Sequence, residues 1–394
     1  MTMGTGRRPA RRMAVAGVLA LVTTLVAQTG PAYAAPTVRG HQWHLDTLRI
    51  DEVHRVTTGE GVVVAVVDSG VDATHPDLAG QVLEGSRMTG DQDKGLVDNR
   101  NHGTGVAGLI AGNGRGPDSV LGIAPGAKIL PVKVFSGGLG GTDVPQGIRY
   151  AVDQGADVIN VSMSVGQTDR LLEALHYAQS HDVVVVASAG NKVDAEDPEA
   201  DPDRGVEVPG RIPGVLAVSA VDAKGRFWDG GLRGPEIALS APGVELAVLT
   251  AADMEPLGEP LRPGYDLMMG GTSAASPIVA GAAALLRAQF PELSAANVVN
   301  RLIATADDLG APGRDEEYGF GQVNILRALT EEVPEVPEHP LGKVPSPDLG
   351  PRTELWTPDL TLILVVGLAF GVVVMSLVAG LIVFLVRRNR RPAR

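Results

Sequence analysis

The chain has 394 residues, no cysteine and a formal net charge of −13. The lack of cysteine excludes disulfides, thiol catalysis, iron–sulfur clusters and cysteine-ligated zinc. Hydrophobic residues make up 44% and charged residues 20%, values typical of a globular protein. Nine Arg lie near the two ends, which leaves 24 basic against 46 acidic residues in between. This acidic body speaks against a nucleic-acid partner, which favours a basic surface.

The first 34 residues have the three-part pattern of a secretory signal peptide. Four Arg precede an apolar run over 13–27, and Ala32 and Ala34 form an A-x-A cleavage site. An uncleaved anchor is the alternative, but the run is shorter than the roughly 20 residues of a spanning helix. We therefore predict a signal peptide over 1–34 and an N-terminal extension over 35–60.

The C-terminal end has the pattern of a membrane anchor. Residues 360–386 carry no charge, which predicts a transmembrane helix, and the tail 387–394 holds five Arg. Because basic residues stay on the cytoplasmic side, we expect a single-pass protein of the cell membrane with its body outside. Gly367 and Gly371 form a G-x-x-x-G pair, which fits either a helix partner or incidental small residues.

A proline-rich segment precedes this span. Residues 331–359 contain seven Pro and show no apolar periodicity. Such a composition predicts a semi-rigid, extended stalk, which at about 3.1 Å per residue reaches roughly 90 Å.

The body, 61–330, alternates apolar β-branched runs with amphipathic segments. Unbroken apolar strands indicate burial on both faces of a sheet, and the strand–helix alternation predicts mostly parallel pairing. The expected fold class is therefore α/β, with three layers and a central sheet between helices. The expected strands are 62–67, 128–134, 158–163, 183–187 and 215–221, and the expected helices are 144–154 and 169–180.

Two motifs place a carboxylate and an imidazole at chemically useful positions. Asp68 ends a buried strand just before Ser69 and Gly70, at the rim where open α/β sheets hold their sites. His102 begins a glycine-rich helix, from which its ring can face outward. Alone, Asp68 is equally a turn residue and His102 an ordinary helix-start histidine.

Two further motifs supply a hydroxyl and an amide. Ser273 lies at the start of a small-residue helix, where the helix dipole and free amide groups favour a developing anion. Asn191 follows another buried strand and can donate to an oxyanion. A capping Ser and a turn Asn are the ordinary alternatives for each motif in isolation.

The order Asp, His, Asn, Ser carries a specific resemblance. The chain resembles the subtilisin-like (S8) serine peptidases, and the similarity extends over about residues 42–329. Its signal peptide, Pro-rich stalk and terminal span are similar to those of mycosins, the membrane-anchored proteases associated with actinobacterial type VII secretion. The matching segments are VVDSGVDATHPDL, NHGTGVAGLIAG, VINVSMS, ASAGN and GTSAASP.

The resemblance implies a role for each of these residues. Ser273 would be the nucleophile, His102 the general base and acid, Asp68 the residue that orients the imidazole, and Asn191 an oxyanion-hole donor. Subtilisins usually carry Gly where Ser164 stands, so this side chain is expected to narrow the first specificity pocket. No cofactor and no metal are expected. The segments implied to bind an extended substrate are Ser162, Met163 and Ser164, and Ser188, Ala189 and Gly190.

Two features concern control of the enzyme. Only about 25 residues separate the cleavage site from the expected core, too few for a folded inhibitory pro-domain, so we expect unaided folding. The extension 35–60 is a candidate to lie across the site. The loop 192–204 holds six acidic residues, which suit calcium, basic substrate segments or simply a solvated loop.

We therefore expect a membrane-anchored extracellular serine endopeptidase that cleaves peptide substrates, namely proteins exported by a type VII secretion system. The alternative is a structural subunit of the secretion complex in which proteolysis is dispensable. The two differ in whether a Ser273→Ala protein still supports secretion.

Overall fold

The computed structural model describes the body of the chain. The predicted signal peptide 1–34, the tail 387–394 and, apart from Gly380, the span 360–386 lie outside the described residues, as does the acidic loop beyond Lys192 up to 204. Within the part that is described, no helix combines the length and apolar character needed to cross a membrane. The described residues are 37–88, 93–116, 118–135, 143–192, 205–252, 254, 258–346 and 380.

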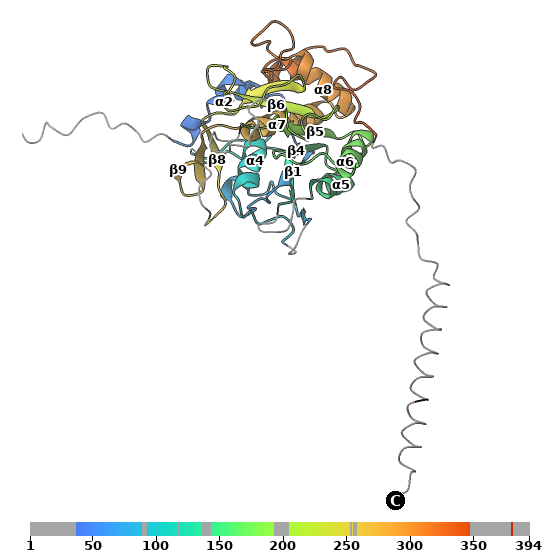
Figure 1. Ribbon diagram of the computed structural model, residues 1–394. Helices are drawn as coiled ribbons and strands as arrows, with labels where there is room; N and C mark the ends of the chain where they lie inside the picture. The colour runs from blue at the N-terminus through green and yellow to red at the C-terminus, as the bar shows by residue number, and fades with distance from the viewer. Residues whose placement is uncertain are drawn as a thin grey trace, which may run out of the picture. The chain divides into compact units, whose positions relative to one another are not determined.

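A seven-stranded parallel sheet forms the centre of the body (Figure 1). Its spatial order is β2-β3-β1-β4-β5-β6-β7, and all six pairings are parallel. The five predicted strands are confirmed with ends shifted by one or two residues. The strands are β1 (Val63–Asp68), β2 (Ser86–Arg87), β3 (Lys128–Lys133), β4 (Val158–Val161), β5 (Val184–Ser188), β6 (Leu216–Val221) and β7 (Ile237–Pro242).

Helices cover both faces of this sheet, which confirms the three layers. Side chains alternate along β1, so Val64 and Val66 face one hydrophobic cluster while Ala65 and Val67 face another. The first cluster includes residues of α4 (His102–Ala111) and α7 (Thr272–Gln289), and the second includes residues of α5 (Val144–Asp153) and α6 (Asp169–Ser180). The helix expected over 169–180 has these same bounds in the structure.

A small antiparallel sheet and two strands of the seven-stranded sheet, β2 and β7, were not predicted. The small sheet has the order β8-β10-β9, with β8 (Leu246–Leu249), β9 (Glu259–Arg262) and β10 (Tyr265–Met268). Strand β9 is largely exposed and lacks apolar alternation. In β7, Ser240 and Pro242 interrupt the apolar pattern by which a strand is recognised.

The N-terminal extension packs into the body from residue 37 onward. Leu45, Ile50 and Val53 are buried and belong to the same cluster as α4 and α7. The indole nitrogen of Trp43 donates to the carbonyl of Val244 at 3.0 Å. This segment is therefore part of the hydrophobic core. Its short helices are η1 (Arg39–His41), α2 (Trp43–Thr47) and α3 (Ile50–Val53), and the only other 3-10 turn among the described residues is η2 (Pro76–Leu78).

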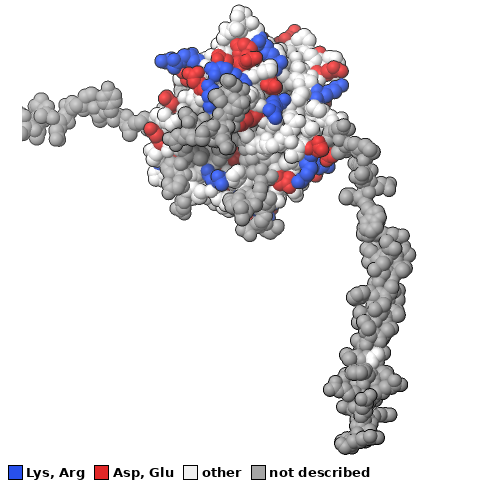
Figure 2. Space-filling model, in the orientation of Figure 1, with Lys and Arg blue, Asp and Glu red and all other residues white. Residues whose placement is uncertain are grey.

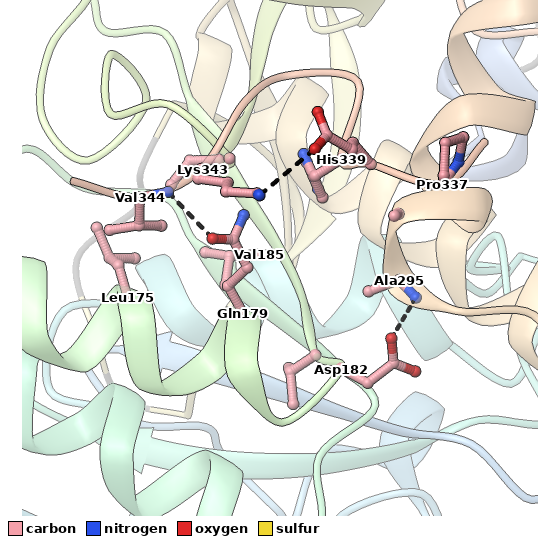
Figure 3. Close-up of a pocket in the computed structure, with 14 residues that line it drawn as sticks. Leu175, Gln179, Asp182, Val185, Ala295, Pro337, His339, Lys343 and Val344 are labelled. Atoms are coloured by element: carbon pink, nitrogen blue, oxygen red, sulfur yellow. Dashed lines mark hydrogen bonds and ion pairs between the residues drawn. The ribbon is translucent and has the colours of Figure 1, made fainter. Parts of the chain in front are cut away.

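The first half of the predicted stalk also packs on the body. After α8 (Ala295–Ala304) and α9 (Ile325–Thr330), residues 331–346 form what we call the C-terminal strap. The carboxamide of Gln179 on α6 accepts from the backbone nitrogen of Val344 at 3.0 Å (Figure 3). Val344 is 4% exposed. The chain thus stays on the body up to residue 346, and only 347–359 of the predicted stalk lies outside the described residues.

Candidate active site

Three neighbouring strands bring the predicted site residues to one edge of the sheet. Asp68 ends β1, Ser162 follows β4 and Ser188 ends β5, and these strands are adjacent in the order β1-β4-β5. Because the strands are parallel, their carboxyl ends meet at the same edge, where sites of open α/β sheets lie.

Asp68 and His102 contact each other directly. Nδ1 of His102 lies 2.9 Å from both carboxylate oxygens of Asp68. Asp68 is 1% exposed, whereas the His102 side chain retains 26% of its exposure. Burial acts to lower the pKa of His102, but the charge and hydrogen bond of Asp68 outweigh it and raise the pKa above its ordinary 6.5. A carboxylate at Nδ1 places the ring proton there, so Nε2 is left to accept a proton.

A second buried carboxylate, Asp98, holds the helix that carries His102. Its Oδ2 accepts from the backbone nitrogen and hydroxyl of Thr104 at 2.8 and 2.7 Å. Its Oδ1 accepts from the hydroxyl of Ser69 at 2.8 Å, and that hydroxyl accepts from the nitrogen of Gly103 at 3.0 Å. Asp98 therefore ties α4 to the end of β1. The sequence reading missed it, although an Asp just ahead of a helix is a capping signal.

Gly103 lets α4 approach the end of β1 closely. A Cβ at this position would lie 2.1 Å from the carbonyl oxygen of Gly70. No side chain fits at that separation, so the Asp68–His102 distance depends on glycine here.

Asn191 and Ser273 are connected through Thr272. The Oδ1 of Asn191 accepts from the backbone nitrogen of Thr272 at 3.0 Å and from its hydroxyl at 2.9 Å. These bonds fix the carboxamide plane and turn its nitrogen away from Thr272. Ser273 is the next residue, within the first turn of α7, as the sequence predicted.

Ser162 joins β4 to α7. Its carbonyl accepts from the hydroxyl of Ser273 at 3.2 Å. Its own hydroxyl lies 2.7 Å from that of Ser276 and accepts from the side-chain nitrogen of Asn160 at 2.8 Å. The Ser162 side chain is thus engaged with buried protein groups. Its backbone alone remains a candidate for the substrate contact that the resemblance implies.

The other residues implied to bind substrate form two neighbouring segments. Met163 and Ser164 follow β4, and Ala189 and Gly190 follow β5. The Ser164 hydroxyl, which the sequence suggested would narrow a pocket, donates to the carboxylate of Glu207. Glu207 was not singled out from the sequence, because it stands in a loop without a motif.

Neither the charged side chains nor the potential metal ligands of the described residues form a second candidate site. On the face shown in Figure 2, acidic and basic side chains are interspersed among uncharged ones. Among the residues that the structure describes, no group of three or more His, Asp and Glu is placed to hold a metal ion. The acidic loop that suggested calcium lies beyond these residues.

Comparison with known proteins places this geometry in a family. The family model described as "Subtilase family" matches residues 59–321. Fervidolysin of Fervidobacterium pennivorans is 34% identical over 318 residues, which cover 74% of this chain and 44% of fervidolysin. Mycosin-1 of Mycolicibacterium smegmatis is 30% identical, covering 85% of this chain and 86% of mycosin-1.

A solved structure agrees with these sequence matches. The structure of the MycP3 protease from the type VII (ESX-3) secretion system is 30% identical with a TM-score of 0.63, and the match covers 77% of this chain and 90% of that one. The family model alone covers well over half of the chain. This chain therefore belongs to the subtilase family of serine peptidases and is similar to the mycosins within it.

Proposed function

We propose that this chain is a membrane-anchored extracellular serine endopeptidase that processes proteins exported by a type VII secretion system. The observation that carries the catalytic part is the contact of His102 Nδ1 with both Asp68 oxygens at 2.9 Å. This contact lies at the same edge of the sheet as Ser162, whose carbonyl accepts from the hydroxyl of Ser273.

In the proposed reaction, the Ser273 hydroxyl attacks the substrate carbonyl while His102 Nε2 takes the hydroxyl proton. In the structure this hydroxyl donates to the Ser162 carbonyl at 3.2 Å, a long distance for an O–H donor. Because this hydrogen bond is weak, little free energy is lost when the Ser273 hydroxyl donates to His102 instead. Asp68 stabilises the imidazolium, which then gives its proton to the leaving amine. Water then attacks the acyl-enzyme while His102 takes the proton of the water, and His102 returns this proton to Ser273 as the acid product leaves.

The negative charge on the substrate oxygen needs donors that are already oriented. The Asn191 nitrogen and the backbone nitrogen of Ser273 suit this role, because Thr272 holds the Asn191 oxygen on the opposite side of the amide. The amino end of α7 adds a partial positive charge next to Ser273.

The cellular part of the proposal rests on sequence pattern and similarity. The apolar residues 360–386 and the Arg-rich tail support an anchor with the body outside the cell. The likeness to mycosin-1 and to MycP3, a protease of a type VII secretion system, supports the choice of substrates.

Labelling with a fluorophosphonate probe tests the chemistry on the full-length chain purified in detergent. We expect labelling of the wild type and of Ser180→Ala, an exposed serine control, and none of Ser273→Ala. Folded wild-type protein that is not labelled would contradict the proposed activity.

The same substitution tests the purpose of the activity in cells. If proteolysis is required, cells with Ser273→Ala lose processing and secretion of the exported proteins. Unchanged secretion with unprocessed substrates would instead support the alternative, a structural subunit with dispensable proteolysis.

A further inference from the structure

The loop that carries Glu207 lies against both segments implied to bind substrate. The backbone nitrogen of Glu207 donates to the carbonyl of Ala189 at 2.9 Å. The next carbonyl, that of Val208, accepts from the nitrogen of Val165 at 2.9 Å. One strip of backbone therefore bridges the segment after β5 and the segment after β4.

The carboxylate of Glu207 also contacts both segments. It accepts from the hydroxyl of Ser164 on one side. On the other side, a Cβ at Gly190 would lie 2.7 Å from its Oε2 and 2.9 Å from its Cδ. Gly190 also has a φ of +103°, which favours glycine. The absence of a side chain at Gly190 leaves room for this acid.

The position of this carboxylate has a chemical consequence. We infer that Glu207 is a specificity-determining residue that selects Arg or Lys as the substrate residue immediately before the cleaved bond; this inference rests on the proposed function. Ser162 to Ser164 and Ser188 to Gly190 are the segments between which that residue would lie. Glu207 is partly buried, so its charge acts in an environment of lower dielectric constant than bulk water.

The guanidinium group of Arg fits this arrangement in particular. It can pair with both oxygens of a carboxylate, and a charge-assisted pair is stronger than a neutral hydrogen bond. The Ser164 hydroxyl is bound to Glu207 at present and adds an oxygen that can accept from the same cation. An uncharged residue of equal size offers this carboxylate no opposite charge.

Two peptides that differ only before the cleaved bond, one with Arg and one with its uncharged isostere citrulline, test the inference. On the full-length wild-type protein we expect kcat/KM to favour Arg by about tenfold to one hundredfold. Glu207→Gln keeps an acceptor for Ser164 and should bring the ratio close to one. Glu292→Gln, an exposed control, should keep the wild-type ratio. No Arg preference in the wild type, or a preference that survives Glu207→Gln, overturns the inference.

A binding measurement separates this inference from the proposed activity. Calorimetry on Ser273→Ala should show tighter binding of benzamidine than of uncharged benzamide, and Ser273→Ala/Glu207→Gln should lose the difference. If the peptides are not cleaved although this difference is present, the proposed activity fails and overturns the inference about cleavage, while a preference of Glu207 for a bound cation is retained. If the peptides are cleaved without any charge preference, the proposed activity stands and the inference is overturned. Equal binding of the two compounds also overturns the inference.

Discussion

The two halves of the site are held by different kinds of interaction. The half that contains Asp68 and His102 is organised by two buried carboxylates, Asp68 at 1% and Asp98 at 4% exposure. The half that contains Asn191 and Ser273 is organised by uncharged amides and hydroxyls, through Thr272. The first half therefore controls the protonation of His102, and the second half fixes the positions of Asn191 and Ser273.

This difference separates the expected effects of substitution. Removing a charge from the first half changes both the tautomer and the pKa of His102. In the proposed mechanism, removing a donor from the second half withdraws stabilisation from the transition state and leaves the pKa of His102 unchanged.

The largest expected effect is on Asp68. Asp68→Asn keeps the shape but lets the proton of His102 move to Nε2, so we expect a loss of about 10⁴ in kcat. Steady-state kinetics on a chromogenic peptide measure it. Asp98→Asn, which removes a buried charge that does not contact Nδ1 of His102, is the control and should lose less. A loss of tenfold or less for Asp68→Asn would show that the first half does not set protonation.

The next effect concerns Asn191. Asn191→Ala should lower kcat by about 10² to 10³ with a small change in KM, as expected for one oxyanion donor. Asn191→Asp keeps an oxygen for Thr272 but removes the donor, so it should not restore turnover. Recovery in Asn191→Asp would mean that Asn191 acts only by holding Thr272.

A smaller effect is expected at Ser162. Ser162→Ala leaves the buried groups of Asn160 and Ser276 without this partner, at a cost of about 1–3 kcal/mol in the free energy of unfolding. The backbone carbonyl that binds Ser273 remains, so activity at a temperature below melting should be nearly preserved. Denaturant unfolding measures the first effect, with Ser180→Ala as control. An unchanged stability would show that this network does not fasten the second half.

The subtlest effect is the pH dependence of kcat/KM. The raised pKa of His102 means that the base is protonated, and inactive, up to a pH above its ordinary 6.5, and that activity increases as pH rises through that pKa. Asp68→Asn removes the negative charge, so the midpoint of its residual activity should move to lower pH. Asn191→Ala should keep the wild-type midpoint. A shift of this pH midpoint in Asn191→Ala would contradict the conclusion that only the first half controls the protonation of His102.

Much of the fold could be predicted because its signals are local. The helix over 169–180 begins after Thr168, whose hydroxyl accepts from Leu171, and such a cap is visible in the sequence. The central strands are unbroken apolar runs. Strand β9 shows no such run, because its neighbour β10 supplies its pairing and its side chains are mostly exposed.

The site was predictable where residues stand in motifs, and it was not where the fold alone brings residues together. Asp68 ends a strand, Asn191 follows one, and His102 and Ser273 lie in the first turn of a helix, so each is placed at the edge of the sheet. Glu207 reaches Ser164 and Gly190 from a loop whose local sequence gives no hint of either neighbour. Likewise, the strap shows no apolar period, and its attachment depends on carboxamides of α6 and α8.

The strap changes the geometry of the proposed tether. Because residues up to 346 pack on the body, only 13 residues of the predicted stalk remain before the predicted span, and a fully extended tether of that length, at about 3.1 Å per residue, would reach at most about 40 Å instead of roughly 90 Å. A shorter tether would confine the enzyme to a smaller volume. If the proposed anchor holds the enzyme at a membrane, its effective concentration near that surface would rise about tenfold, since the volume scales with the cube of the reach. Substrates that emerge from an adjacent export channel would meet it more often than those that diffuse in from outside.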